Sequence, residues 1–157
     1  ETDRARMGLL KGIDGLLTAD LLYVLRSMGH GDSICICDCN FPAAEVATHT
    51  TSKRVVHIAG ADLPQTLNAV CSVLPLDLFI DTPAVHMAPQ QGTSMPPLGT
   101  EVIDKAQQVV AFHSPVDTIV DLKGVERFEF YALARKCFAV VQTSERRPYG
   151  NVILTKG

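Results

Sequence analysis

The stretch that decides the fold is SMGHGDSICICDCNFP, residues 27–42. Within it, residues 33–38 alternate isoleucine with cysteine, so a strand would place isoleucines on one face and thiols on the other. Because neither face is polar, we predict that helices cover both faces of this strand, as in a parallel-type α/β sheet. A tight Gly-His-Gly-Asp connection, with His30 between the glycines, precedes the strand, and Asp38 follows it.

The rest of the chain alternates helices and strands in the same way. A helix is predicted over 18–28, with Thr18 as its N-cap, and another over 62–73, with Asp62 as its N-cap. Further helices are predicted over 101–112, capped by Thr100, and over 125–136, and strands over 54–58, 82–87, 137–142 and 151–155. We therefore predict a single three-layer α/β domain over residues 9–157, with a mostly parallel sheet flanked by helices. Residues 1–8 are predicted to be an extension or a cloning remnant.

The composition excludes several classes of protein. At 157 residues with 46% hydrophobic side chains, the chain can bury a sizeable core. The 14 basic and 17 acidic residues give a net charge of -3 without a basic block, and Trp is absent, which argues against a nucleic-acid partner. The charged start carries no leader-like apolar run and no later apolar stretch is long enough for a membrane span, so we expect a soluble cytoplasmic protein with no membrane partner.

The five cysteines are more typical of packing than of chemistry. They are Cys35, Cys37, Cys39, Cys71 and Cys137. An odd number with C-x-C-x-C spacing does not match the disulfide framework of a small secreted domain. Zinc sites usually present C-x2-C pairs with a second pair of ligands, which the sequence lacks. We therefore predict small apolar side chains in a buried strand, and no metal site.

Polar residues at strand ends and in short turns are the best candidates for a site. The glycine-rich nucleotide loops, the G-x-S-x-G elbow and the H-E-x-x-H motif are absent, so no cofactor is predicted. Open α/β sheets place their ligands at strand ends. The polar residues at such positions are His30, Asp32, Asp38, Arg127, Glu129, Tyr131, Tyr149 and Asn151.

Two of these candidates bracket the central strand. The glycines beside His30 let the backbone approach a ligand, and the dipole of the preceding helix favours a protonated imidazole, which suits a proton donor and acceptor. A solvated loop histidine is an equally good interpretation. For Asp38 the pattern alone favours a turn aspartate that caps the bend at residues 40–42.

The remaining candidates lie late in the chain. Tyr149 and Asn151 can each donate and accept hydrogen bonds, as binding of hydroxyl groups requires. The alternative is a turn in which Gly150 supplies a positive φ. In the helix over 125–136, Arg127 and Glu129 could be a solvated face, while Phe128, Tyr131 and Ala132 are predicted to form the core-facing stripe.

Four blocks taken together resemble the ribose pyranase and fucose mutarotase family. They are Met-Gly-His-Gly-Asp at 28–32, Asp-x-x-Phe-Pro at 38–42, Phe-x-Phe-Tyr at 128–131, and Thr-x-Glu-Arg with Tyr-Gly-Asn-Val-Ile-Leu at 143–154. Their order and spacing agree with the family, and the resemblance runs from about residue 9 to 157.

The resemblance implies a cofactor-free reaction on a free monosaccharide. Members interconvert anomers or ring forms and commonly assemble into rings in which a neighbouring subunit completes each site, so it implies a homo-oligomer, with a decameric ring as one candidate. It implies that His30 is catalytic and that Asp38, Tyr149 and Asn151 bind the sugar. Residues 127–131, with Arg127, are similar to the fucose branch, which favours L-fucose over D-ribose, although Asn40 stands where fucose mutarotases often have histidine.

The predicted function is therefore that of an isomerase of the L-fucose mutarotase type, which acts as a carbohydrate epimerase. Two alternatives are a ribose-pyranase-type interconversion of pyranose and furanose forms, and a sugar-binding module without turnover. A thiol or metal protein built on Cys35, Cys37 and Cys39 is the least favoured, because of the cysteine spacing.

Overall fold

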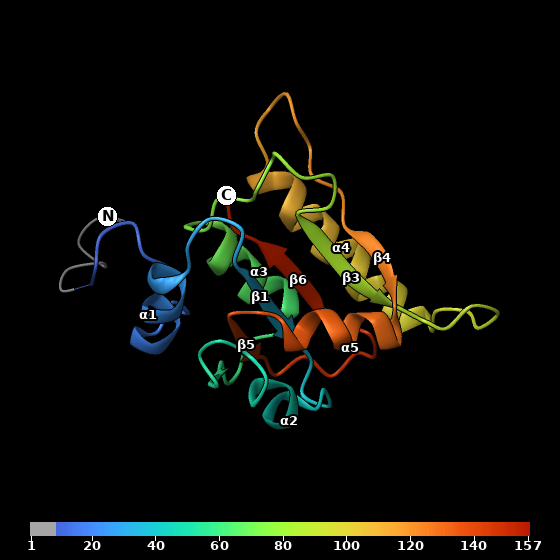
Figure 1. The fold of residues 1–157 in the computed structure, drawn as a ribbon. Coiled ribbons are helices and arrows are strands. Elements are labelled where there is room, and N and C mark those ends of the chain that lie inside the picture. Colours follow the sequence, from blue (N-terminus) through green and yellow to red (C-terminus); the bar gives the residue numbers. More distant parts are fainter. Residues whose placement is uncertain (1–8) are drawn as a thin grey trace.

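A six-stranded sheet forms the middle layer of the computed structural model, which describes residues 9–157 (Figure 1). The strand order is β2-β5-β1-β6-β3-β4. The strands are β1 (Ser33–Cys37), β2 (Val55–His57), β3 (Ala84–Ala88), β4 (Lys123–Glu126), β5 (Ala139–Gln142) and β6 (Val152–Thr155). All neighbours pair in parallel except β6, which is antiparallel to β1 and β3, so the mostly parallel sheet is confirmed. The predicted extension at residues 1–8 lies outside the described residues.

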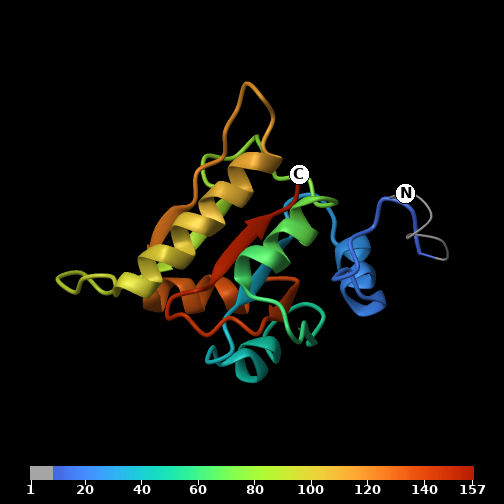
Figure 2. The ribbon, with the colours of Figure 1, turned by 180° about the vertical axis from the view of Figure 1, so that it is seen from behind.

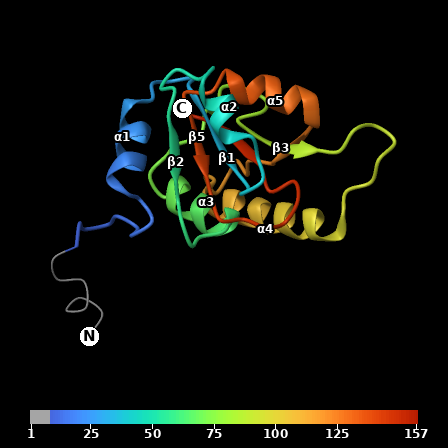
Figure 3. The ribbon, with the colours of Figure 1, turned by 90° about the horizontal axis from the view of Figure 1, so that it is seen from below.

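Helices form the two outer layers. From behind, α3 (Leu63–Cys71) and α4 (Pro97–His113) cover the sheet (Figure 2), and α1 (Ala19–Ser27) packs into the same core. The opposite face carries α2 (Ala43–Ala47) and α5 (Arg127–Arg135), as the view from below shows (Figure 3). Within residues 9–157, no helix has both the length and the apolar character that crossing a membrane would need.

The central strand has the two buried faces that its alternation predicts. Ile34 and Ile36 lie in the core under α1, α3 and α4, and Cys35 and Cys37 lie in the core under α2 and α5. All four are fully buried. The packing prediction is wrong for Cys39, which is exposed, because the strand ends at Cys37 and the chain turns outward.

Local signals place two helix starts correctly. The Thr18 hydroxyl accepts a hydrogen bond from the Leu21 amide at the start of α1. At the start of α3, Asp62 and Gln65 form a reciprocal capping box. The predicted cap at Thr100 is wrong, because α4 begins at Pro97, whose fixed φ suits the first position of a helix.

The core-facing stripe of α5 differs from the prediction. Phe130 and Ala134 are fully buried, whereas Phe128 is 58% exposed. The chain enters α5 directly from β4, which was not predicted, and the Glu126 carboxylate accepts hydrogen bonds from the first amides of the helix. This entry rotates the helix so that Phe130 faces the sheet and Phe128 faces outward.

Candidate functional site

Asp38 and Asn151 meet at the end of the sheet where the parallel strands finish, which we call the Asp38 edge. Five strands run in the same direction and end at this edge, and the reversed strand β6 begins there. Asp38 directly follows β1, and Asn151 directly precedes β6, its neighbour. The Asp38 amide donates to Asn151 Oδ1 at 2.9 Å, and Asn151 Nδ2 donates to Asp38 Oδ2 at 3.1 Å. Both residues are buried, so the fold joins two predicted candidates.

The Asp38 carboxylate also shapes the turn that follows it. Its Oδ1 accepts a hydrogen bond from the Asn40 amide at 3.0 Å, so the predicted turn-capping role is present beside the contact with Asn151. Burial raises the pKa of Asp38; hydrogen bonds from Asn40, Asn151 and Phe41 oppose this effect, and the nearby charge of Glu145 adds to it. A partly desolvated carboxylate gains from a further donor, and a ligand hydroxyl would supply one.

Tyr149 reaches the same edge in a strained conformation. Its φ is 64°, in the left-handed region that side chains other than glycine rarely adopt, at a cost of roughly 1–2 kcal/mol. The prediction that Gly150 supplies the positive φ is therefore wrong. Gly150 is needed for another reason: a Cβ there would lie 2.7 Å from Glu145 Cγ. Strain of this kind gathers at functional sites.

Arg127 and Tyr131 form the wall on the α5 side. The Arg127 guanidinium lies 5.7 Å from the centre of the Tyr131 ring, and its Nε is 3.4 Å from Tyr131 Oη. Tyr131 in turn packs against Phe41, with ring centres 5.5 Å apart. Tyr131 therefore fixes the arginine beside the pocket.

These groups surround one cavity of ≈ 240 Å³, which we name the Asp38 pocket. It is lined by Asp38, Asn40, Phe41, Met87, Arg127, Tyr131, Glu145, Arg146, Arg147, Pro148, Tyr149 and Asn151. Pockets for drug-sized ligands typically measure about 300–1,000 Å³. The smaller volume and the mixture of a carboxylate, an amide, phenols and guanidinium groups suit a small polyhydroxylated molecule.

His30 lies at the opposite end of the sheet, where the parallel strands begin, which we call the His30 edge. It precedes β1, and five strand residues at about 3.3 Å each separate the two edges by roughly 17 Å. Within one chain the structure therefore does not bring His30 to Asp38. The His30 side chain is 62% exposed, and its Nε2 lies 3.7 Å from Asp77 Oδ2. Beside it, Phe79 is 94% exposed, with its ring centre 6.3 Å from that of the imidazole.

Asp77 is the residue that sequence reasoning missed. It is buried, and its Oδ1 accepts a hydrogen bond from the Phe79 amide at 3.0 Å. Its neighbour Leu76 forms a bridge with Lys156, whose carbonyl accepts a hydrogen bond from the Gly31 amide. The last residues of the chain thus place Asp77 beside His30. No local sequence pattern carries that information.

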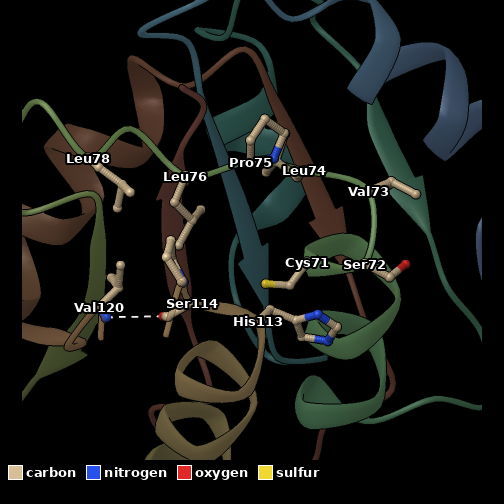
Figure 4. A pocket seen from close by; sticks show the side chains of 11 residues that line it. Cys71, Ser72, Val73, Leu74, Pro75, Leu76, Leu78, His113, Ser114 and Val120 are labelled. Atoms are coloured by element: carbon tan, nitrogen blue, oxygen red, sulfur yellow. Dashed lines mark hydrogen bonds between the residues drawn. The ribbon is translucent and has the colours of Figure 1, made fainter. Parts of the chain in front are cut away.

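A second cavity, of ≈ 370 Å³, flanks the His30 edge (Figure 4). It is mostly apolar, and the polar side chains described there bond to neighbouring protein groups. His113 Nε2 is 2.9 Å from Asn68 Oδ1, and Ser114 Oγ lies between the Val110 carbonyl and the Val120 amide. Burial raises the pKa of the Cys71 thiol to about 12, so this cysteine is a poor nucleophile. The larger cavity is thus the weaker candidate.

No cluster of three or more His, Cys, Asp or Glu side chains suited to holding a metal ion occurs in the part of the chain from residue 9 onward.

Known proteins resemble this chain over almost its full length. A family model described as the RbsD / FucU transport protein family matches residues 11–157. Fucose mutarotase from Homo sapiens is 40% identical over 151 residues, which is 96% of this chain and 95% of the human protein. The solved structure of Atu2016, a putative sugar binding protein, has a TM-score of 0.84 and 38% identity, over 96% of this chain and 97% of that one.

A third relative was solved with a ligand. The fucose mutarotase from Streptococcus pneumoniae in complex with L-fucose has a TM-score of 0.79 and 30% identity, and the match covers 94% of this chain and 98% of that one. The family match and these near-complete alignments agree with the four sequence blocks and with the observed fold. This chain is a member of the RbsD/FucU family.

Proposed function

We propose that this chain is an L-fucose mutarotase, an isomerase that interconverts the α and β anomers by acid–base ring opening. The observation that carries the proposal is the Asp38 pocket, in which a buried carboxylate, paired with Asn151, faces Tyr149 and Arg127 in a cavity of monosaccharide size. The names of the full-length relatives support the same activity.

The reaction needs only proton transfers. The anomeric hydroxyl loses a proton, the ring oxygen gains one as its bond to the anomeric carbon breaks, and the open aldehyde rotates before the ring closes on the other face. We assign the proton exchange to His30, with Asp77, 3.7 Å away, orienting the imidazole. Asp38, Asn151, Tyr149 and Arg127 hold the sugar hydroxyls. A positioned acid–base group of this kind accelerates a reaction by about 10²–10⁴-fold.

We further propose that the complete site forms between two copies of the chain. His30 and Asp38 lie at opposite edges of the sheet, so a neighbour must bring its His30 to the Asp38 pocket. The exposed ring of Phe79 lies beside His30, its chain neighbours Leu78 and Ile80 are also exposed, and such a contact would bury this apolar segment. A head-to-tail contact gives a ring when its rotation closes, and we propose such a closed ring, of which a decameric ring is one candidate.

Two finer proposals concern the sugar and the compartment. We favour L-fucose over D-ribose because Arg127 and Tyr131 stack at the pocket wall, in the segment that resembles the fucose branch. We place the enzyme in the cytoplasm because its five cysteines are free thiols, a state that a reducing compartment maintains.

The test is NMR saturation transfer between anomers of L-fucose, with D-ribose and D-galactose in parallel. We expect the wild type to enhance exchange most for L-fucose, and His30→Ala to abolish the enhancement. The matched control is His49→Ala. His49 pairs with Glu45 on the surface and belongs neither to the Asp38 pocket nor to the surroundings of His30. Unchanged exchange in His30→Ala would refute the role of His30. Sugar binding by the wild type without any enhancement would favour a binding module.

A further inference from the structure

A largely buried ion pair forms part of the wall of the Asp38 pocket. Glu145, in the loop between β5 and β6, is only 2% exposed. Its Oε1 accepts hydrogen bonds from the Arg147 amide at 2.9 Å and from Arg147 Nε at 2.8 Å. Its Oε2 accepts from Arg147 Nη2 at 2.9 Å and from the Leu63 amide at 3.1 Å. Four protein donors occupy the carboxylate, so Glu145 is a structural anchor rather than a ligand group.

Arg147 connects this loop to two helices. Its Nη2 lies 3.4 Å from Asp62 Oδ2 at the start of α3, and its Nη1 lies 3.5 Å from Glu101 Oε1 on α4. The arginine side chain is 16% exposed, unlike surface ion pairs such as Arg135 with Glu45. Low exposure reduces screening by solvent and makes the loss of one partner costly.

The strained part of the loop rests on this ion pair. A Cβ at Gly150 would lie 2.7 Å from Glu145 Cγ and 3.3 Å from the Arg147 carbonyl oxygen. The adjoining residue is Tyr149, with its φ of 64°. A tyrosine keeps such a conformation only where its surroundings over-determine it. The ion pair and its links to α3 and α4 provide that constraint.

We propose that Arg147 is a positioning residue of the sugar site, which acts with Glu145 to hold Tyr149 against the ligand. The proposal rests on the proposed function, because it assigns Tyr149 to sugar binding. Arg147 borders the pocket, but its guanidinium donors point to Glu145, Asp62 and Glu101. Its effect on the sugar is therefore indirect.

The first test compares Michaelis constants. Arg147→Met should raise KM for L-fucose by roughly tenfold, the equivalent of one lost hydrogen bond, and leave kcat within about twofold. Arg147→Lys should recover part of the loss, because it keeps a charge but not the bidentate geometry. The control is Arg135→Met, the same substitution at a surface ion pair. A merely structural role would lower the folded fraction, and so kcat, at unchanged KM; that result would overturn the proposal.

A double-mutant cycle tests the route through Tyr149. Tyr149→Phe should raise KM on its own, and Arg147→Met/Tyr149→Phe should be no worse than the more impaired single variant, because both changes remove the same contact. Additive effects would mean that Arg147 acts elsewhere. If Arg147→Met fails to fold, Glu145→Gln/Arg147→Met takes its place in both tests, since it leaves no unpaired buried charge.

Hydrogen exchange separates this proposal from the proposed function. Amides of residues 145–151 and of the first turn of α3 should exchange faster in Arg147→Met than in the wild type, with no change in β1. Unchanged exchange in the loop would overturn the positioning role whatever the activity. A wild type that enhances no sugar would overturn the proposed function, and faster loop exchange in the variant would still support the ion pair as the loop anchor.

Discussion

The two edges of the sheet carry opposite kinds of polar group. At the Asp38 edge, a carboxylate and an amide are buried and bonded to each other, beside a strained tyrosine. At the other edge, an imidazole stands in solvent above a single buried carboxylate, with an almost fully exposed phenylalanine beside it. The first edge is a preorganised polar surface within one chain, and the second presents an exposed imidazole that lines neither of the two cavities.

This difference fits the roles that we propose for the two groups. A binding carboxylate is effective when it is desolvated and rigid, because the ligand then replaces little water and orders few side chains. A proton-exchanging imidazole must reset its proton after each turnover, which access to solvent allows. Placing the two at opposite edges satisfies both needs only if a neighbouring copy joins them.

The largest expected effect is a loss of turnover that complementation between two variants partly restores. This experiment tests the proposed shared site. His30→Ala and Asp38→Asn should each lower turnover by about 10²-fold or more. Coexpressed in equal amounts, they should recover activity in about a quarter of the sites, those that combine an intact His30 from one copy with an intact Asp38 from the other. The readout is anomer exchange by the purified mixed assembly.

The matched control for complementation is His30→Ala coexpressed with the double variant His30→Ala/Asp38→Asn, which offers no intact histidine and should recover nothing. If the mixed single variants assemble normally and also recover nothing, the two groups do not share a site across copies, and the comparison of the two edges loses its functional meaning.

The second prediction concerns acid stability at the Asp38 edge. Burial tends to raise the pKa of Glu145, but hydrogen bonds from Arg147 and from the Leu63 amide outweigh it and lower the pKa from 4.5 to about 2. Its stabilisation is therefore present above pH 4.5 and is lost as the pH falls through about 2. At about 1.4 kcal/mol per unit, the contribution is on the order of 3 kcal/mol.

Urea unfolding of the wild type and Glu145→Gln between pH 5 and pH 2 measures this contribution. The difference in unfolding free energy between the two proteins should shrink as the pH falls. The pH dependence that Asp38 contributes has the opposite sign to that of Glu145. Because the pKa of Asp38 is raised in the folded protein, its protonation adds stability at low pH, and this stability is lost as the pH rises through that pKa. A difference independent of pH would contradict the role of Glu145 as an ionised anchor.

The third prediction replaces the donor of one hydrogen bond with an acceptor. Asn151→Asp keeps the shape but puts a second carboxylate where Nδ2 donates to Asp38 Oδ2. We expect a loss of about 2 kcal/mol of stability at pH 7, and less at pH 4, where the pair shares a proton. L-fucose binding should fail at pH 7. The control, Asn68→Asp on the surface of α3, should change stability by less than about 0.5 kcal/mol, and an equal loss at both pH values would exclude charge repulsion as the cause.

Local signals were enough to predict most of the framework, and the resemblance named two residues that the fold brings together. The alternation in β1 specifies two covered faces, and the caps at Thr18 and Asp62 involve residues only three positions apart. Asp38 and Asn151 were predicted as sugar ligands by resemblance, and strand pairing explains why they meet. These features are predictable because each depends on neighbours along the chain or along one pair of strands.

The remaining features depend on contacts that no local pattern records. Asp77 reaches His30 through a bridge to the last residues of the chain. Tyr149, rather than Gly150, takes the positive φ, and Gly150 is needed because Glu145 occupies the space where a Cβ would lie. Phe128 faces outward because β4 sets the entry into α5. The separation of His30 from Asp38 is different, because it follows from the length of β1, a strand that the local alternation at residues 33–38 already predicts.

The smallest expected effect concerns the two cysteines whose environments differ most. Cys35→Ser should cost about 1–3 kcal/mol, because a buried hydroxyl would replace a thiol in an apolar layer. Cys39→Ser, at the exposed turn after β1, should cost less than about 0.5 kcal/mol, and Cys39 should react fastest with a thiol reagent in the native protein. Slow reaction of Cys39 in the assembled protein, with fast reaction after dissociation, would show that a neighbour covers the Asp38 edge. Fast reaction in both states would mean that no neighbouring copy covers Cys39. A contact between copies would then involve only other residues around the Asp38 pocket.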